Sequence, residues 1–199
     1  MKSVIAAFDF DKTITTRDTL LPFLFGLHSR RQNMLNALKL LPTAVRYQLG
    51  HLENHIAKER ILTTFLPDYT LPYLIQQAET FAHRVIPQWV RPQALQRIYW
   101  HHAQGHRCIL LSAGLEIYLQ FWAAAFPFET VLATRLSVEQ NQVTGKINGR
   151  NCFGQEKVNR LLAYAGPREN FTLYAYGDSR GDRELLAAAD YPFYRHMPL

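Results

Sequence analysis

The sequence predicts an α/β sandwich around a mainly parallel sheet, with a block of helices inserted after the first strand. Two observations predict this fold. In the second half of the chain, short apolar runs typical of buried strands alternate with segments of helical spacing. Residues 19–83 are helical in character throughout and separate the first apolar run from the others. The length of 199 residues suits one domain that carries an insertion.

The first half of the chain contains one predicted strand, at residues 4–8, followed by helices. Helices are predicted over residues 31–49, 52–66 and 71–84. Pro42 is expected to kink or divide the first of them, because proline removes a helical hydrogen bond. This first helix repeats apolar side chains at helical spacing: Met34, Leu35, Leu38, Leu41, Val45 and Leu49.

After Pro87 the pattern alternates between helices and strands. Strands are predicted over residues 107–111, 128–133, 171–176 and 191–194. Helices are predicted over residues 92–104, after Gly114 through Phe126, over 155–165 and over 180–188. Residues 136–138 and 142–144 flank Asn141 and predict a small hairpin. The alternation implies parallel strands joined by crossover helices.

Composition excludes several classes of protein. Hydrophobic residues make up 48 % of the chain and charged residues 19 %, which is typical of a folded domain and not of a disordered one. The net charge of +6 is dispersed, so we expect no nucleic-acid partner. No stretch reaches the roughly 18 apolar residues of a membrane span, although Arg30, Arg31 and Arg46 leave a peripheral contact with anionic lipid open. Two cysteines provide no disulfide framework, which favours a cytoplasmic location.

Four of the seven aspartates lie in two clusters, each directly after a predicted strand. Asp9 and Asp11 follow the first strand, and Asp178 and Asp182 follow a late one. Ligands of open α/β sheets gather at the carboxyl ends of the strands. Carboxylates held together repel each other unless a cation compensates, and sites of carboxylates and water suit Mg²⁺. The clusters therefore predict a magnesium site at this edge of the sheet.

Two further residues fit a phosphate site. Ser112 follows the strand at residues 107–111, and with the backbone N–H groups of Ala113 and Gly114 it could hold phosphate oxygens at a helix start. Lys157 lies near the start of the next predicted helix, where an ammonium can reach a phosphate or offset the carboxylates. Taken alone, Ser112 would more often be a helix N-cap than a ligand, and Lys157 would usually be a solvated lysine.

Together these features resemble the four motifs of the haloacid-dehalogenase-like phosphatases. The motifs are DFDKT at residues 9–13, Ser112, Lys157 and GDSRGD at residues 177–182, in the order of the family. The resemblance implies a Rossmann-like three-layer core of residues 1–15 and 88–199, with an α-helical cap of residues 16–87. The cap resembles that of the phosphoserine-phosphatase-like branch, and hydrolases similar to phosphatidylglycerophosphatase C are nearest.

The resemblance also implies roles for individual residues. Asp9 would attack phosphorus and become an aspartyl-phosphate, and Asp11 would protonate the leaving alkoxide and then activate water. Mg²⁺ would be held by the Asp9 carboxylate, the Asp11 backbone carbonyl and Asp178. Ser112, Ala113 and Lys157 would bind the phosphoryl group.

Asp182 would orient the metal shell or Lys157, with stabilisation of a helix N-terminus as the alternative. Lys12 departs from the family, which often has Gly or Ser there. Its side chain could line the entrance of the site or point to solvent, and we expect solvent. Substrate contacts from the cap are expected from Asp18 and from Arg60 or Lys58. This match does not assign phosphoserine as the substrate.

The predicted function is Mg²⁺-dependent hydrolysis of a small phosphorylated metabolite through an aspartyl-phosphate. Three alternatives stay open: a phospholipid head-group phosphatase, a phosphotransferase with the same intermediate, and a phospho-ligand binder without catalysis. The sequence does not define the oligomeric state. A serine hydrolase is excluded because Ser112 lacks the G-x-S-x-G sequence of that class.

Overall fold

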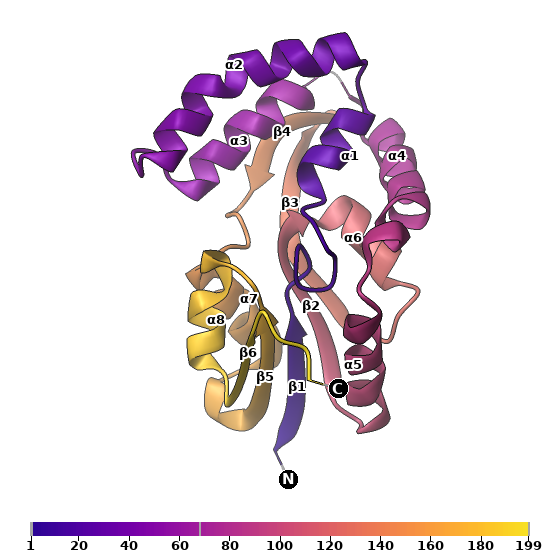
Figure 1. Ribbon diagram of the computed structural model, residues 1–199, viewed down its shortest axis with the longest axis vertical. Helices are drawn as coiled ribbons and strands as arrows, with labels where there is room; N and C mark the ends of the chain where they lie inside the picture. The colour runs from indigo at the N-terminus through magenta and orange to yellow at the C-terminus, as the bar shows by residue number, and fades with distance from the viewer. Residues whose placement is uncertain (1, 68, 199) are drawn as a thin grey trace.

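The computed structural model describes residues 2–67 and 69–198 and contains a six-stranded sheet (Figure 1). Its strand order is β4-β3-β2-β1-β5-β6. Neighbouring strands are parallel except β4, which is antiparallel to β3. This arrangement confirms the predicted α/β class with a mainly parallel sheet. The strands are β1 (Ser3–Phe8), β2 (Arg107–Leu115), β3 (Thr130–Glu139), β4 (Gln142–Asn148), β5 (Phe171–Gly177) and β6 (Tyr191–Tyr194).

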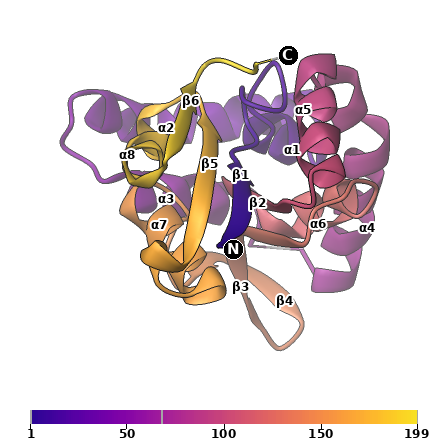
Figure 2. The ribbon, with the colours of Figure 1, turned by 90° about the horizontal axis from the view of Figure 1, so that it is seen from below.

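Helices cover both faces of the sheet, which makes the core three-layered (Figure 2). On one face lie α5 (Pro92–Ala103) and α6 (Glu116–Ala123), and on the other lie α7 (Gln155–Ala165) and α8 (Arg183–Ala188). Because side chains alternate along a strand, β1 supplies Ala6 and Phe8 to the first apolar cluster and Ile5 and Ala7 to the second. Both cysteines lie in these clusters as buried, free thiols.

The inserted block consists of α1 (Leu20–Gly26), α2 (Arg30–Gln48), α3 (Asn54–Phe65), α4 (Leu71–Arg84) and the 3₁₀ turn η1 (Ile86–Trp89). Its two connections to the sheet pair with each other. The Thr16 N–H donates to the Trp89 carbonyl at 2.8 Å, and the Arg91 N–H donates to the Ile14 carbonyl at 2.8 Å. One apolar cluster nevertheless runs through the sheet and the inserted helices. The division into a core of residues 1–15 and 88–199 and a cap of residues 16–87 therefore stays a prediction.

A hairpin from the core side, β3–β4, reaches the inserted helices. Its turn, at Gln140 and Asn141, has positive φ at both residues, as tight hairpin turns require. β4 packs on α3 so closely that a Cβ at Gly145 would lie 2.6 Å from the Cα of Thr63. The Leu71 N–H also donates to the Asn141 carbonyl at 2.9 Å. The predicted hairpin is thus present and supports the inserted helices.

Several elements differ from their predicted form. α2 is one continuous helix, so Pro42 does not divide it. β2 continues to Leu115, and α6 starts at Glu116 and ends at Ala123, because a bulge carries the strand past Ser112. The predicted helix at residues 180–188 begins with a 3₁₀ turn, η3 (Arg180–Asp182), and a second turn, η2 (Arg168–Asn170), precedes β5.

Candidate active site

The loop after β1 places Asp9 at the carboxyl end of the central strand. The Asp9 N–H still donates to the Tyr176 carbonyl of β5 at 2.9 Å, which keeps the residue in line with the sheet. The chain then turns tightly, with the Thr15 N–H donating to the Phe10 carbonyl at 3.0 Å. Lys12 lies in this turn with φ of 61°, a conformation that glycine adopts more easily. A glycine at position 12 would therefore fit this turn with less strain than lysine.

The Asp9 carboxylate belongs to a buried ionic cluster. The Lys157 ammonium lies 2.6 Å from Asp9 Oδ1 and 2.6 Å from Asp182 Oδ1. The Thr13 hydroxyl donates to Asp9 Oδ2 at 3.0 Å. One cation therefore joins the acidic groups that follow β1 and β5, and it holds the Asp9 side chain in a single orientation.

Asp182 fixes the loop that carries Asp178. Its Oδ2 accepts hydrogen bonds from the Ser179 N–H at 3.1 Å, the Ser179 hydroxyl at 2.9 Å and the Asp178 N–H at 3.2 Å. The loop can close this tightly because residue 177 is glycine, where a Cβ would lie 2.5 Å from the Cβ of Asp182. One oxygen of Asp182 therefore contacts Lys157, and the other holds the loop at the start of the short helical turn of residues 180–182. Contacts thus exist for each of the two roles predicted for Asp182.

Carboxylate oxygens converge at the expected cation site. Asp9, Asp178 and Asp182 each offer an oxygen, and these atoms lie within 4.8 Å of one another. Asp182 Oδ1 accepts a hydrogen bond from Lys157 and its Oδ2 accepts three more, whereas each Asp9 oxygen accepts only one, which favours Asp9 and Asp178 as ligands. An all-oxygen donor set of few carboxylates fits Mg²⁺, which retains several waters. The residues present therefore fit the ion that the sequence predicts.

The Asp11 side chain is held apart from this group. Its Oδ1 accepts hydrogen bonds from the Thr19 N–H at 2.9 Å and the Thr19 hydroxyl at 2.7 Å, and that hydroxyl lies 3.0 Å from the Tyr118 hydroxyl. Burial raises the pKa of Asp11 to about 6, although the hydrogen bonds from Thr19 lower it. A carboxyl group with such a pKa can donate and accept a proton near neutral pH.

The surroundings of the Asp9 carboxylate differ from those of Asp11. Burial raises the pKa of Asp9 to about 7, Lys157 opposes this shift, and the Asp182 charge adds to it. A cation beside the carboxylate would favour the ionised form, and attack on phosphorus requires that form. The two acidic groups after β1 thus differ in partners: Asp9 faces a fixed cation, whereas Asp11 faces neutral hydroxyl groups.

Ser112 lies in a bulge of β2, where β2 pairs with β3 through Ser112 and Leu115 and skips the residues between. The Gly114 N–H donates to the buried Ser112 hydroxyl at 2.9 Å. Ala113 and Gly114 precede the helix, which begins at Glu116. The helix therefore starts slightly later than expected, and these N–H groups belong to the bulge that precedes its N-cap, Leu115.

The helix α3 brings a lysine to this bulge. Lys58 is buried, and its ammonium donates to the Asn151 side-chain oxygen at 3.1 Å and to the Ala113 carbonyl. Burial lowers the pKa of Lys58 to about 8. Arg60, which is two positions further along the helix and points to another side, is exposed. Of the two expected cap cations, the structure brings Lys58 to the site and not Arg60.

The other expected cap residue, Asp18, lies at the rim. Its carboxylate pairs with the Lys12 ammonium at 2.6 Å, and both side chains are more than half exposed. Lys12 is thus half exposed, as expected, but it also lines the cavity beside the site. Thr13, Thr19 and Asn151 were not predicted as site residues. Thr13 lies in the DFDKT segment and could have been found from it, but Thr19 and Asn151 have no sequence signal.

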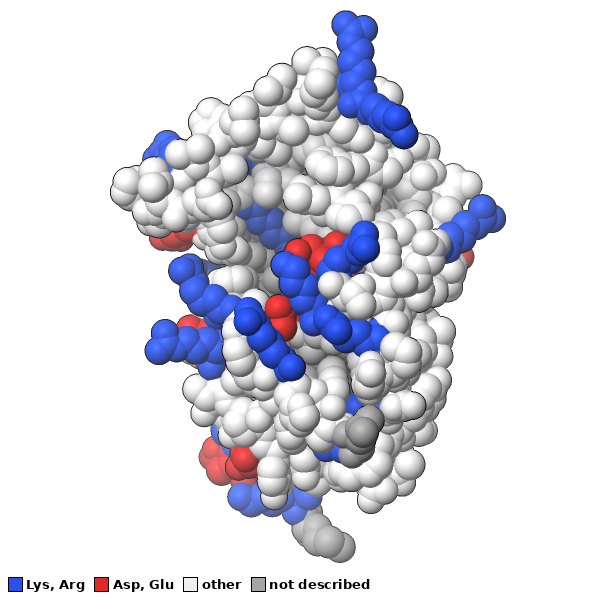
Figure 3. Space-filling model, in the orientation of Figure 1, with Lys and Arg blue, Asp and Glu red and all other residues white. Residues whose placement is uncertain are grey.

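A cavity of about 570 Å³ opens beside the acidic residues. It is lined by Lys12, Arg91 and Arg195, together with Asp178. Arg195 Nε donates to the Asp178 carbonyl at 2.9 Å, which fixes this arginine at the rim. Figure 3 shows acidic side chains at the centre of this face with basic ones around them. Such a ring of cations attracts an anionic ligand.

The fold and the site together define an α/β enzyme with its acidic groups at the carboxyl ends of the central strands. The family model of the haloacid dehalogenase-like hydrolases matches residues 6–187. The chain belongs to this family.

Two curated relatives and two solved structures are similar to the chain. Protein CicA of Caulobacter vibrioides is 30 % identical over 193 residues, which are 96 % of this chain and 86 % of CicA. The probable phosphatase Rv3661 of Mycobacterium tuberculosis is 27 % identical, with 92 % of this chain and 65 % of Rv3661 covered. A protein of unknown function from Bordetella pertussis Tohama I has a TM-score of 0.82 and 26 % identity, covering 98 % of this chain and 90 % of that one.

A substrate-bound phosphoserine phosphatase has the same fold, with a TM-score of 0.62, 15 % identity, and coverage of 95 % of this chain and 84 % of that one. These comparisons confirm the predicted family and an enzyme of the hydrolase class, with phosphatases among its relatives.

Proposed function

We propose that the protein is a Mg²⁺-dependent phosphomonoesterase that works through an aspartyl-phosphate on Asp9. The observation that carries the proposal is the Asp9 carboxylate, fixed by Lys157 at 2.6 Å and by Thr13 at 3.0 Å, at the carboxyl end of β1. A nucleophile held in one orientation beside a cation suits attack on a phosphate ester. Family membership and the name of the Mycobacterium relative support phosphatase chemistry.

In the proposed first step, an Asp9 oxygen forms a bond to phosphorus and the bond from phosphorus to the ester oxygen breaks. The departing alkoxide takes the proton of Asp11, whose raised pKa keeps a protonated fraction near neutral pH. Ser112 and Lys157 bind the transferring phosphoryl oxygens, where neutralisation of charge supplies most of the catalysis.

In the second step, water attacks phosphorus and the bond to Asp9 breaks, which releases inorganic phosphate. Asp11, now ionised, accepts the proton of that water. Its hydrogen bonds from Thr19 keep the carboxylate in the same place for both transfers. One group thus serves as acid and then as base.

The oxygen set of Asp9, Asp178 and the Asp11 backbone carbonyl would hold Mg²⁺. When bound, the ion neutralises charge on the phosphoryl oxygens and favours the ionised form of Asp9. Asp182 acts indirectly, since its hydrogen bonds to Ser179 and to the Asp178 N–H position the loop.

For the substrate we propose a small phosphorylated metabolite that enters through the cavity lined by Lys12, Arg91 and Arg195. Lys58 from α3 supplies a further cation to the bulge that contains Ser112. A phosphotransferase with the same intermediate is distinguished by supplying alcohols as acceptors. Comparing phosphatidylglycerophosphate with soluble esters tests the lipid head-group alternative.

The test of the proposed function is the substitution Asp9→Asn, assayed with Mg²⁺ on a panel of phosphate esters. We expect loss of turnover with an unchanged circular dichroism spectrum and retained binding of inorganic phosphate. Turnover like that of the wild-type protein would refute the nucleophile. Removal of divalent cations with EDTA should abolish wild-type turnover, and Mg²⁺ should restore it.

A further inference from the structure

Most apolar side chains of the helix α2 face outward, with Leu40 half-buried against the core, and the two buried residues of the helix are polar. Its buried residues are Asn36 and Thr43, and Asn36 Nδ2 is buried without a hydrogen-bond partner. Along the opposite side runs a row that we call the α2 stripe, with exposed fractions between 53 % and 63 %: Met34, Leu38, Leu41, Val45 and Leu49. Apolar residues at helical spacing usually mark the side of a helix that packs on a core, whereas in α2 this side faces outward.

The α2 stripe runs without a gap along one side of the helix. Its members are three or four positions apart, which places them on one side of a helix. The 19 residues of α2 give it a length of about 28 Å. Leu35 at 42 % exposed lies beside the row and broadens it. Soluble monomers seldom leave a contiguous apolar surface of this length in water.

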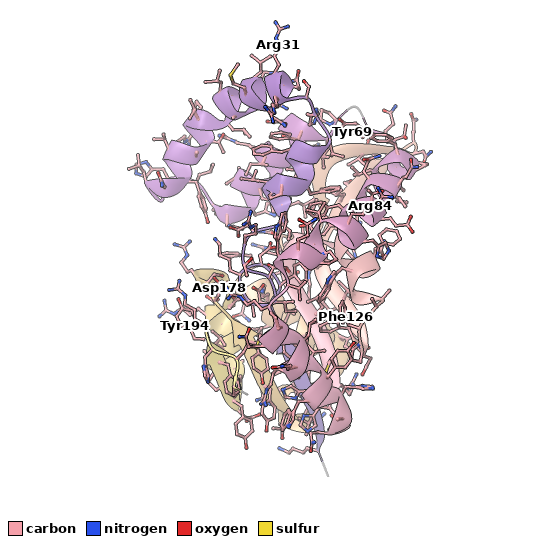
Figure 4. All side chains as sticks on the ribbon, turned by 45° about the vertical axis from the view of Figure 1, so that its right-hand side comes forward. Arg31, Tyr69, Arg84, Phe126, Asp178 and Tyr194 are labelled. Carbon is pink, nitrogen blue, oxygen red and sulfur yellow. The ribbon has the colours of Figure 1, made fainter. Side chains whose placement is uncertain are left out.

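The charged side chains of α2 itself all have the same sign. The sequence contains no acidic residue between Asp18 and Glu53, whereas it has four basic ones there: Arg30, Arg31, Lys39 and Arg46. Figure 4 shows Arg31 projecting from α2 away from Asp178 and the active site. In Figure 1, α2 forms the outer edge of the molecule, with nothing beyond it.

This charge pattern indicates which kind of partner covers the α2 stripe. A second copy of the chain, placed stripe against stripe, would bring two sets of four like charges together, which disfavours pairing. An anionic lipid surface instead supplies apolar depth for the leucines and negative charge for the basic residues. No helix among residues 2–67 and 69–198 is long and apolar enough to cross a membrane, so α2 would lie in the plane of the surface.

We propose that α2 is an interfacial helix that docks the protein on the surface of an anionic lipid bilayer. The α2 stripe inserts at the level of the acyl chains and the four basic residues contact lipid phosphates. The active site, on the other side of the inserted helices, stays open while α2 is docked. The proposal does not depend on the reaction that the site performs.

The experiment is co-sedimentation of the full chain with vesicles of phosphatidylcholine, with and without phosphatidylglycerol. We expect binding to the anionic vesicles that weakens as salt is raised, and little binding to the neutral ones. Leu38→Gln/Leu41→Gln should weaken the binding about tenfold or more. The matched control is Tyr99→Gln/Val138→Gln, which changes exposed apolar residues elsewhere and should bind like wild type.

A second pair of variants tests the charges. Lys39→Gln/Arg46→Gln should weaken binding about tenfold, whereas Lys146→Gln/Arg183→Gln, at exposed positions on other elements, should not. Hydrolysis of a soluble ester should be unchanged in all four variants. Absence of binding to anionic vesicles, or equal binding by the stripe variant, would overturn the proposal. So would a wild-type dimer in analytical ultracentrifugation that Leu38→Gln/Leu41→Gln dissociates.

Discussion

The ammonium of Lys157 lies 2.6 Å from a carboxylate oxygen of Asp9, although 148 positions separate the two residues in the chain. The parallel pairing of β1 with β5 and the position of α7 on one face of the sheet make this contact possible. Both side chains are almost fully buried. The proposed nucleophile therefore depends on a residue that is distant in the sequence.

Loss of the cation at this position should affect both activity and stability. Lys157→Met leaves Asp9 and Asp182 buried together, so we expect a loss of about 3–5 kcal/mol in the free energy of unfolding. Turnover should fall by about a hundredfold to a thousandfold. Denaturant unfolding and steady-state kinetics measure the two effects.

Lys146→Met, at an exposed position, serves as the control for this substitution and should change neither quantity. Adding Asp182→Asn to Lys157→Met should restore part of the stability but not the activity. If Lys157→Met alone retained wild-type stability, the buried ionic cluster would not have the role assigned to it.

The role of Asp11 predicts a dependence on the leaving group. Asp11→Asn keeps an oxygen for the hydrogen bonds from Thr19 but cannot transfer a proton. Turnover of an alkyl phosphate should fall by about 10²–10⁴-fold. With p-nitrophenyl phosphate, whose leaving group needs no proton, formation of the intermediate should be nearly unaffected and a burst of nitrophenol should precede slow turnover. An equal loss in the first step for both esters would argue against Asp11 as the acid.

Lys58 predicts how stability changes with pH. Burial lowers the pKa of Lys58 from 10.5 to about 8, so between these values the unfolded state binds more protons than the folded state. The contribution of Lys58 to stability therefore rises with pH in this window, by roughly 3 kcal/mol at most. Lys58→Met removes the cost of the buried charge, so its advantage over wild type should be largest below pH 8 and shrink toward pH 10.5. Thermal unfolding at several pH values measures this difference, and a constant difference would contradict the buried charge.

The contact between the hairpin and α3 predicts a difference between two glycines. Gly145 and Gly149 both have positive φ, but only at Gly145 would a Cβ meet backbone, at 2.6 Å from the Cα of Thr63. Gly145→Ala should therefore destabilise the protein by about 1–3 kcal/mol more than Gly149→Ala. Chemical denaturation of both variants measures this difference. Equal losses would show that the hairpin does not press on α3.

Much of the sheet and its acidic edge could be predicted from local patterns. The helices at residues 71–84 and 155–165 and the strand at residues 191–194 have the predicted bounds. Asp9, Lys157 and Asp182 come together as expected, because residues that follow parallel strands gather at one edge. The DFDKT and GDSRGD segments are local in sequence, so spacing alone was enough to find them.

The remaining features depend on tertiary contacts. The bulge that carries β2 past Ser112 depends on its pairing with β3, which no local pattern shows. Lys58 and Arg60 are both basic residues of α3, and only the packing of this helix decides which of them enters the site. The apolar spacing of α2 would ordinarily indicate a buried side, and only the structure shows that this side faces outward. The bulge, the choice between Lys58 and Arg60 and the orientation of α2 all depend on tertiary packing, which periodicity does not encode.

The most direct test of the central claim is to locate the phosphoryl group during turnover. Enzyme mixed with a phosphate ester and Mg²⁺ is quenched in acid, reduced with borohydride and digested for peptide mass spectrometry. Reduction converts an aspartyl-phosphate to homoserine, and we predict homoserine at position 9, dependent on substrate and absent in Asp9→Asn. Homoserine at another aspartate, or none during rapid turnover with a positive control for trapping, would contradict the account.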